Sequence, residues 1–342
     1  MTTMRRVVVH PGRITVETAG IPVPGPGEAL VRTIAAGVCG SDLHAAHGRH
    51  PFVPLPYRPG HEVVGVIEAV DPAVQARRPG ERVIVEPYLP CWACKMCTSG
   101  RENLCENLKF FGCGYAQGGM ADYFTLAANR LHPVPDTLDD HTAALIEPLS
   151  TPVHAVRLAG DVTGRSVAVL GAGTIGLFTL AVLRAHRAGK VVITDPNLAK
   201  RERAMALGAD AAVEARTPDV AGQVRDVLGG SADIVFDCVA IQSSVDQAIA
   251  MADKGGTVVV VGVPARDVTI PLPIVQDHQI RIQGSATYLP EDYAESAALL
   301  GRGTVRKADF VTATRPLAQV AEAFELAASG HHVKVLVTVG ER

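Results

Sequence analysis

Residues 166–195 read SVAVLGAGTIGLFTLAVLRAHRAGKVVITD. The stretch runs from a short apolar β-type segment, 166–170, through three glycines into an apolar helical segment, 177–187, and then reaches a second β-type segment, 191–195. Short continuous apolar runs are typical of strands that are buried on both faces of a sheet. The succession of strand, glycine turn, helix and strand therefore predicts a doubly wound parallel sheet.

The glycines of this stretch, Gly171, Gly173 and Gly176, match the G-x-G-x-x-G pattern between a strand and a helix, with Thr174 and Ile175 inside it. The first glycine allows a tight turn, the second lets the backbone approach a pyrophosphate, and the third permits close packing of helix on strand. Unpaired N–H groups at the start of the helix favour an anion there. We therefore expect a dinucleotide-binding site.

The second strand ends in an acid, Asp195, at the position where dinucleotide-binding sheets place one. A carboxylate there accepts hydrogen bonds from a ribose 2′-hydroxyl and repels a 2′-phosphate, which predicts NAD rather than NADP. Lys200 and Arg201 lie nearby and weaken that preference. We assign Lys200 to the cofactor site as well, together with Val261 and Val263 at the end of a later β-type run.

The rest of the chain falls into two kinds of sequence. Alternating helices and strands continue beyond residue 195, with β-type runs at 211–213, 233–237, 256–261 and 279–283. Before residue 150, short β-branched runs alternate with clusters of proline and glycine, at 7–9, 29–34, 63–70, 82–85 and 121–126. This second pattern predicts a small antiparallel barrel with long functional loops. The tail contains helical stretches at 291–300 and 317–329 and a last strand at 333–339, where we expect the chain to return to the first domain.

Length and composition are those of a two-domain globular protein. The chain has 342 residues, 47% of them hydrophobic and 20% charged, and a net charge of −3. It contains no basic run for nucleic acid, and its N-terminal apolar run, 7–9, is too short for a signal peptide. Every apolar stretch is broken well before the ~18 residues that span a membrane. Seven cysteines, four of them clustered, fit a reducing compartment, so we expect a cytoplasmic protein.

The four clustered cysteines are Cys91, Cys94, Cys97 and Cys105. Short C-x2-C turns hold paired thiolates on one side of a loop, so four sulfurs can converge on one tetrahedral zinc. Such a site has no open coordination position and is structural. The alternative is a loop of reduced or disulfide-bonded cysteines, although reduced thiols at this spacing normally bind metal.

A second set of possible ligands is spread over three short segments: Cys39 in CGSDLH (39–44), His61 and Glu62 in GHE (60–62), and Glu147 in EPLS (147–150). Thiolate, imidazole and carboxylate from separate loops are what a catalytic zinc uses, with one position left for water or substrate. Spacing alone does not join these segments. Taken singly, Cys39 reads as a buried small side chain and His61 as a turn histidine.

In this order, these motifs resemble the zinc-containing medium-chain alcohol dehydrogenase family over essentially the whole chain. The EPLS element and the short length are most similar to the sorbitol (polyol) and threonine dehydrogenase branch, since the longer animal alcohol dehydrogenases have a cysteine at the place of Glu147. The resemblance implies an α/β fold. Residues 1–152 and 286–342 would form a GroES-like antiparallel β-barrel, the catalytic domain, with a structural-zinc lobe at 88–108. Residues 153–285 would form a Rossmann domain that binds NAD.

The resemblance also implies roles for the metal ligands. Cys39 and His61 match the constant ligands of the catalytic zinc, and Glu62 and Glu147 match carboxylates that either bind the metal or exchange with water. Which of the two carboxylates touches zinc stays open. With the four-cysteine lobe, the chain would hold two zinc ions.

Further roles concern catalysis and the cofactor. Ser41 matches the hydroxyl of the family's proton relay, and His44 a histidine further along it. Thr151 matches a contact to the nicotinamide, and Asp42 a residue that orients the histidine ligand.

The implied activity is reversible oxidation of a secondary alcohol to a ketone, with zinc as Lewis acid, Ser41 as proton acceptor and NAD as hydride acceptor. Two alternatives stay open: a biosynthetic reductase for a bulky or cyclic ketone, and a non-catalytic NAD-binding protein. A zinc-free quinone reductase of the same superfamily would lack both sets of ligands. By analogy with the family the chain would form a homodimer or homotetramer, its 279–283 strand pairing across a two-fold axis.

The substrate is less well defined than the reaction. Fold analogy places pocket residues in 44–57 and 110–117 and at Tyr288. Gln117 and Tyr57 would suit a polyol, and packing within the loops is an equally good interpretation of both.

Overall fold

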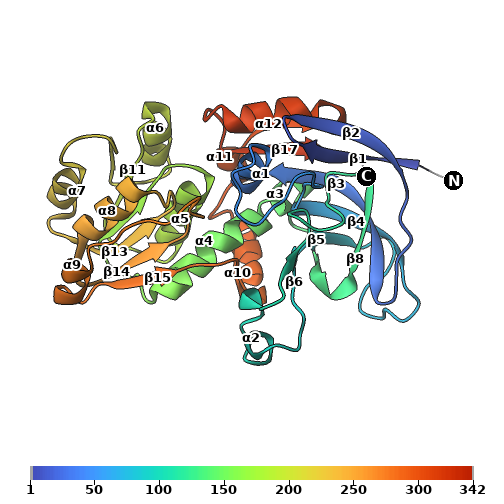
Figure 1. Cartoon of the computed structure of the whole chain (residues 1–342), viewed down its shortest axis with the longest axis horizontal. Coiled ribbons are helices and arrows are strands. Elements are labelled where there is room, and N and C mark those ends of the chain that lie inside the picture. The colour runs from blue at the N-terminus through green and yellow to red at the C-terminus, as the bar shows by residue number, and fades with distance from the viewer. Residues whose placement is uncertain (1–2, 341–342) are drawn as a thin grey trace. The chain divides into compact units, whose positions relative to one another are not determined.

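The computed structural model describes residues 3–340. These fall into two compact units, residues 3–148 with 296–340, and residues 149–295 (Figure 1).

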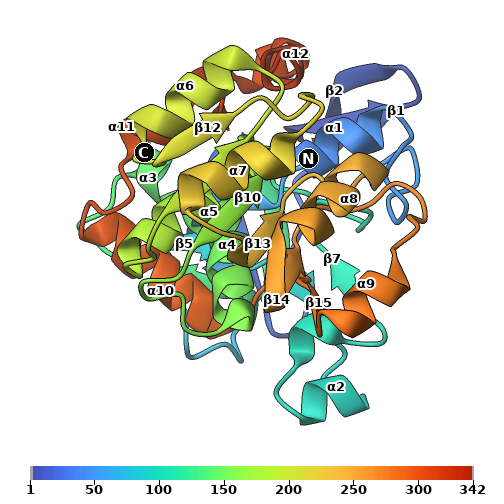
Figure 2. The ribbon, with the colours of Figure 1, turned by 90° about the vertical axis from the view of Figure 1, so that its left-hand side faces the viewer.

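The unit of residues 149–295 is built on a six-stranded sheet in which every pair of neighbours is parallel. Its strands are β10 (Val167–Leu170), β11 (Val191–Thr194), β12 (Ala211–Val213), β13 (Ala232–Asp237), β14 (Ala252–Val260) and β15 (Arg281–Gly284). The order across the sheet is β12-β11-β10-β13-β14-β15, so the direction of winding reverses between β10 and β13. Figure 2 shows β13, β14 and β15 side by side. This is the Rossmann order, in which ligands bind at the carboxyl ends of the strands near the reversal.

Helices alternate with these strands. They are α4 (Ile146–Ala159), α5 (Thr174–Ala185), α6 (Leu198–Ala206), α7 (Val220–Leu228), α8 (Gln242–Met251), α9 (Leu272–Asp277) and α10 (Pro290–Gly301). One apolar cluster joins strands and helices, with Leu170 and Val235 from the sheet packed among Val224, Ile249 and Met251. The central strands are apolar on both faces because both are covered.

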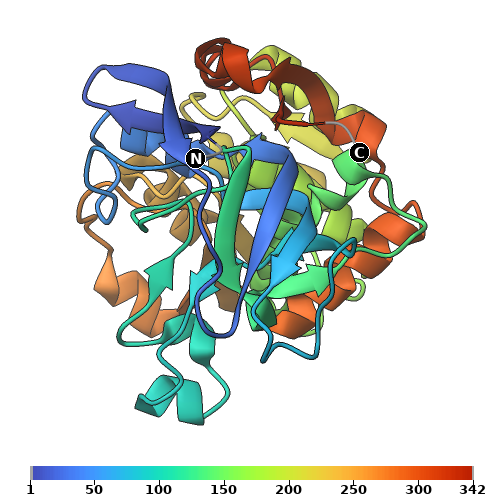
Figure 3. The ribbon, with the colours of Figure 1, turned by 90° about the vertical axis from the view of Figure 1, so that its right-hand side faces the viewer.

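The other unit contains a seven-stranded, mainly antiparallel sheet, seen from its own side in Figure 3. Its strands are β3 (Glu28–Val38), β4 (Glu62–Val70), β5 (Arg82–Val85), β8 (Tyr123–Ala127), β9 (Leu131–Pro133), β16 (Val311–Pro316) and β17 (Lys334–Thr338). The pairing runs β16-β17-β3-β4-β5-β9, and β8 also pairs with β3. Only β16 and β17 are parallel. Two short pairs complete the strands: β1 (Thr3–His10) with β2 (Arg13–Gly20), and β6 (Tyr88–Leu89) with β7 (Lys109–Phe110).

The helices of this unit are short. They are α1 (Gly40–Ala46), α2 (Lys95–Thr98), η1 (Glu102–Leu104), η2 (Ala128–Arg130), α3 (Asp140–Ala143), α11 (Lys307–Phe310), η3 (Leu317–Gln319) and α12 (Val320–Ala328). The apolar core gathers Val31, Val63, Phe124 and Val335 from the sheet with Phe324 from α12. The C-terminal segment therefore completes a sheet that the N-terminal segment begins.

Most predicted elements are present with shifted ends. The predicted helix 177–187 begins at Thr174, because Gly173 in extended backbone is its N-cap. The predicted strand 279–283 begins at Arg281, because Gln279 has a φ of 52° and ends the turn that follows α9. The predicted helix 317–329 is a 3-10 turn followed by α12. No helix among residues 3–340 is long and apolar enough to cross a membrane.

Candidate functional site

Two strand ends bring the first group of predicted metal ligands together. Strands β3 and β4 are antiparallel and pair Gly37 with Glu62, so Cys39, just after β3, lies beside His61, just before β4. One ligand atom from each of Cys39, His61 and Glu62 lies within 4.8 Å of the other two. A Cβ on Gly37 would sit 1.8 Å from Oε2 of Glu62, so the carboxylate occupies space that only glycine leaves.

The charges around His61 suit a cation. His61 is 3% exposed, and its Nδ1 has no hydrogen-bond partner. Burial alone would lower the pKa of His61, but nearby Asp42, Cys39 and Glu147 outweigh it and hold that pKa well above its usual range. A buried imidazole nitrogen without a partner, next to a thiol and carboxylates, is the donor set that zinc takes. The three residues therefore fit a catalytic zinc.

Helix α1 positions the predicted proton acceptor. Ser41 lies in its first turn, with Oγ 3.5 Å from Nε2 of His61, and the exposed His44 follows one turn later. Asp42, fully buried, accepts a hydrogen bond from the Cys39 backbone N–H (3.0 Å) and one from the Tyr57 hydroxyl (3.1 Å). No hydrogen bond joins Asp42 to Nδ1 of His61, but its charge is close enough to raise the pKa of the ring, so its role in orienting His61 stays a prediction. Asp42 also fixes the backbone that carries Cys39.

Sequence reasoning missed Lys334. Its Nζ donates to Oε1 of Glu62 at 2.6 Å and Oε2 at 2.7 Å, and to the Val38 carbonyl at 3.1 Å. The Lys334 side chain is 2% exposed and that of Glu62 is 0% exposed. The available signal was a charged residue inside the apolar strand VKVLV (333–337), where a buried position needs a buried partner.

Glu147 lies in the first turn of α4 and is 5% exposed, and Thr151 follows one turn later. The charge of Glu147 contributes to raising the pKa of both His61 and Lys334, so its carboxylate lies in the same neighbourhood. It is not part of the group of Cys39, His61 and Glu62 whose ligand atoms come within 4.8 Å.

The four clustered cysteines also come together. Cys91, Cys94, Cys97 and Cys105 place their sulfurs within 4.8 Å of one another, and none is in a disulfide. The Sγ of Cys94 lies 3.5 Å from that of Cys97 and 3.9 Å from that of Cys105. Four sulfurs at about 2.3 Å from a central zinc would be about 3.8 Å apart. The backbone N–H groups of Cys91 and Asn107 donate to the Cys105 sulfur, as they would to a thiolate. This loop therefore fits a structural zinc.

The glycine loop has the geometry that a dinucleotide needs. Gly171 has a φ of 93°, and a Cβ on Gly176 would lie 1.8 Å from the Gly171 carbonyl oxygen. A Cβ on Gly173 would meet no protein atom within 4 Å, so the backbone there is open to a ligand. Thr174 and Ile175, both half-buried, begin α5.

Asp195 follows β11 at the same edge of the sheet. Its Oδ2 accepts from the backbone N–H of Ala172 at 2.9 Å, and its Oδ1 from that of Asn197 at 2.8 Å. Lys200, half-buried, lies on α6, and Val261 and Val263 follow β14. Val261 is buried, whereas Val263 is 55% exposed.

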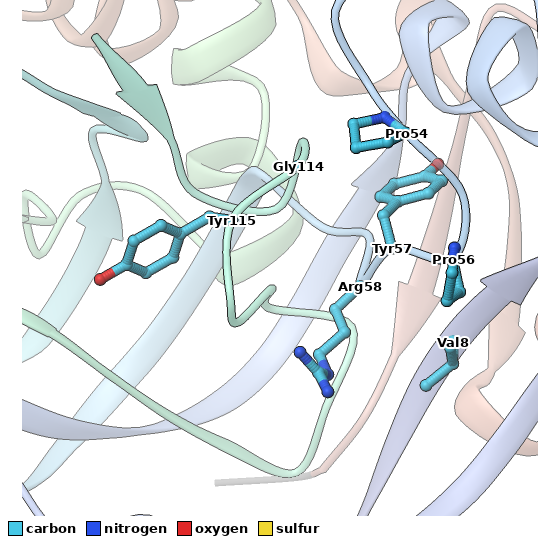
Figure 4. A pocket seen from close by; sticks show the side chains of 7 residues that line it. All are labelled: Val8, Pro54, Pro56, Tyr57, Arg58, Gly114 and Tyr115. Atoms are coloured by element: carbon cyan, nitrogen blue, oxygen red, sulfur yellow. The ribbon is translucent and has the colours of Figure 1, made fainter. Parts of the chain in front are cut away.

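The polar groups expected in a substrate pocket are used within the fold. Gln117 donates to the Thr125 hydroxyl and accepts from its N–H, and the Tyr57 hydroxyl bonds Asp42. Tyr288 is 1% exposed and its ring contacts that of Tyr293 in a tilted arrangement, with centroids 5.1 Å apart. Packing is therefore the better interpretation of these three residues. Tyr57 also lines a small hollow of about 90 Å³ (Figure 4), together with Val8, Pro54, Pro56, Arg58, Gly114 and Tyr115.

Comparison with protein-family models matches residues 25–136 to the alcohol dehydrogenase GroES-like domain and residues 174–302 to the zinc-binding dehydrogenase model. Sorbitol dehydrogenase of Rattus norvegicus is 34% identical over 338 residues, which cover 97% of this chain and 94% of that protein. This chain belongs to the zinc-binding alcohol dehydrogenase family. The L-galactonate-5-dehydrogenase of Escherichia coli K12 is 33% identical to this dehydrogenase over 327 residues, 95% of each chain.

The fold of the dehydrogenase is also that of solved relatives. A zinc-binding dehydrogenase of Sinorhizobium meliloti 1021, bound to NADP, has a TM-score of 0.92 and 32% identity, covering 99% of this chain and 100% of that one. The chain is thus a zinc-dependent, NAD(P)-using oxidoreductase that interconverts alcohols and ketones on a GroES-like and Rossmann-type fold. These relatives do not favour the alternatives of a dedicated ketone reductase or a non-catalytic NAD-binding protein.

Proposed function

We propose that this dehydrogenase oxidises a secondary hydroxyl of a polyol or sugar acid to a ketone, with NAD as the hydride acceptor. The observation that carries the proposal is the cluster of Cys39, His61 and Glu62 with the Ser41 hydroxyl beside it. Relatives named for sorbitol and L-galactonate, both hydroxyl-rich linear chains, support this substrate class. Asp195, anchored at the glycine loop, supports NAD over NADP.

Cys39 and His61 would hold the catalytic zinc, with Glu62 or Glu147 as the carboxylate ligand. Bound there, zinc supplies a Lewis acid that lowers the pKa of an alcohol. The protein's own groups then handle the proton. The Ser41 hydroxyl, 3.5 Å from Nε2 of His61, accepts it, and the exposed His44 one turn later passes it to solvent.

The cofactor would rest on the loop 171–176, with its pyrophosphate on the open backbone at Gly173 and the start of α5. Asp195 has lone pairs left after its two backbone bonds and would accept from the adenosine ribose. Lys200 would lie beside that ribose. Thr151, Val261 and Val263 would contact the nicotinamide half.

The domain limits and the assembly belong to the same proposal. Residues 1–152 with 286–342 would be the catalytic domain, and 153–285 the NAD-binding domain. Strand β15, at the edge of the six-stranded sheet, would pair with its copy in a homodimer, and two dimers would form a homotetramer.

Two variants test the catalytic assignment. Cys39→Ser and His61→Ala should each lower zinc content by one ion per chain and abolish NADH formation from polyols, because each removes one of only three protein ligands. NADH binding, followed by nucleotide fluorescence, should persist in both because the glycine loop is untouched. His331→Ala, which removes an exposed histidine, is the control. Turnover near wild type in both variants would show that the cluster is not the catalytic centre.

A further inference from the structure

An ion pair between Arg201 and Glu214 lies at the carboxyl ends of β11 and β12. These strands are parallel and pair Thr194 with Val213, so the next residues, Asp195 and Glu214, leave the sheet side by side. Arg201, on α6, reaches both. Its Nη1 donates to the Asp195 carbonyl at 2.8 Å and to Oε2 of Glu214 at 2.7 Å. The guanidinium is thereby held between the ends of the two strands.

This ion pair lies next to the proposed cofactor loop. The Asp195 carboxylate accepts from the backbone N–H of Ala172, which stands between Gly171 and Gly173. The Asp195 side chain therefore points to the glycine loop while its carbonyl holds Arg201. The Arg201–Glu214 pair is thus bound to the backbone of the same residue whose carboxylate would face the adenosine ribose.

The pair is more fixed than an ordinary surface ion pair. The Arg201 side chain is 15% exposed and that of Glu214 is 34% exposed. Oε1 of Glu214 also accepts from the Arg216 backbone N–H at 3.2 Å, and the Glu214 carbonyl accepts from the Thr217 hydroxyl at 3.1 Å. The turn after β12 therefore holds the carboxylate in place to receive the guanidinium.

Arg201 is the charged group at this edge that suits a phosphate. Lys200 and Arg216 are neighbours in sequence of Arg201 and Glu214, but Arg201 is the cation that makes an ion pair there, with Glu214. A planar guanidinium is the group that best binds phosphate, through paired N–H donors. An Arg201 without a carboxylate partner would be a natural receptor for a 2′-phosphate.

We propose that Glu214 determines cofactor specificity: it engages the Arg201 guanidinium and so withholds it from the 2′-phosphate of NADP. This inference rests on the proposed function, in which the loop 171–176 binds the cofactor pyrophosphate. The parallel pairing of β11 with β12 places Glu214 next to Asp195. The Glu214 carboxylate binds Arg201 and thereby disfavours NADP. Asp195 and Glu214 then both favour NAD over NADP. The Asp195 carboxylate faces the ribose, and the Glu214 carboxylate binds the Arg201 guanidinium.

The test measures dissociation constants for NADH and NADPH by titration calorimetry, at one ionic strength because screening changes these charges. Glu214→Gln keeps the size of the side chain and removes its charge. Glu202→Gln, an exposed neighbour of Arg201 on α6, removes the same charge elsewhere and is the matched control. The double variant Arg201→Met/Glu214→Gln removes the receptor itself.

Glu214→Gln should tighten NADPH binding relative to NADH roughly tenfold, the effect of about one new charge-assisted contact. Glu202→Gln should leave the ratio within about twofold, and the double variant should lose the gain. An unchanged ratio in Glu214→Gln, an equal gain in Glu202→Gln, or a gain that persists without Arg201 would each overturn the inference while leaving the proposed function intact. If the wild-type protein bound neither nucleotide, the proposed function would fail, and this inference with it.

Discussion

Lys334 and Glu62 are a buried ion pair inside the candidate metal site. Burial alone would lower the pKa of Lys334, but Glu62, Cys39 and Glu147 raise it, so the ammonium stays charged. Both Glu62 oxygens are engaged by Nζ, which fixes the carboxylate next to His61. Lys334 thereby offsets part of the negative charge that the ligands concentrate there.

Removing one partner of this pair leaves a buried charge without compensation. Lys334→Met should lower the free energy of unfolding by about 3–5 kcal/mol. Urea denaturation of the zinc-loaded protein measures the loss. Arg32→Met, which breaks the half-exposed Arg32–Glu68 pair, should cost about 1 kcal/mol or less.

A second change distinguishes loss of charge compensation from loss of packing. Adding Glu62→Gln to Lys334→Met should restore part of the stability, because the uncompensated carboxylate is then absent. If Lys334→Met were no more harmful than Arg32→Met, the pair would contribute little to the fold.

Single site residues could be predicted from the sequence where they lie in short motifs, and not where their role depends on a partner far along the chain. Cys39, His61 and Glu62 could be named because each lies in a short motif, and the antiparallel pairing of β3 with β4 brings them together. Lys334 could not be paired with Glu62, because 272 residues separate them. Gln117 had equally good polar and packing interpretations until Thr125 appeared as its partner.

Among the elements, the glycine loop contains two glycines with different surroundings, so the same substitution should have different effects at Gly173 and Gly176. Gly176→Ala should lower the free energy of unfolding by about 1–3 kcal/mol, because its Cβ would overlap the Gly171 carbonyl. Gly173→Ala should change stability by about 1 kcal/mol or less, since its Cβ meets no protein atom. It should nevertheless weaken NADH binding, because the cofactor needs that space.

Thermal denaturation and NADH fluorescence titration measure the two effects separately. A Gly173→Ala protein that binds NADH as tightly as wild type would contradict the placement of the pyrophosphate.

The four-cysteine loop gives a second prediction for an element. Around α2 and η1 it has little regular structure of its own, and its sulfurs stand at the spacing of a zinc tetrahedron. Cys94→Ser should therefore reduce zinc by one ion per chain and lower the melting temperature, because structural zinc contributes directly to folding. Ser99→Ala, an exposed change in the same loop, should do neither. Full zinc content with an unchanged melting temperature in Cys94→Ser would exclude the structural role.

The elements themselves were predictable where a run of one kind of residue defined them. The strands at 82–85 and 211–213 have the expected ends, because an acidic residue stands directly before and after each of them. Strand β15 starts later than expected because of the left-handed backbone at Gln279, which no apolar pattern reveals. The parallel pairing of β16 with β17 likewise depends on contacts outside either strand.

At the scale of the whole molecule, the edge of the six-stranded sheet is the element that assembly would use. Strand β15 pairs with β14 on one side, and its Ile282 side chain is 39% exposed. An unpaired edge with an exposed apolar side chain favours strand addition by a second copy. Ile282→Asp should therefore reduce the mass measured by light scattering from a dimer or tetramer to a smaller species.

Val23→Asp, an equally polar change at an 85% exposed position outside this sheet, should leave the mass unchanged. A wild-type protein that is monomeric at micromolar concentration would refute assembly through β15.

The place of Lys334 in the chain has a consequence for how the protein is made. Chains are synthesised from the N-terminus at roughly 5–20 residues per second. Lys334 is therefore added about 14–54 s after Glu62, because 272 residues separate them. Residues 149–295 are complete before that lysine exists and can fold first. Until β17 arrives, the metal-site carboxylate has no counter-charge, and the adjoining part of β3 has an unpaired edge on a growing chain. Lys334 and the rest of β17 must therefore be made before Glu62 gains its counter-charge and β3 its second neighbour.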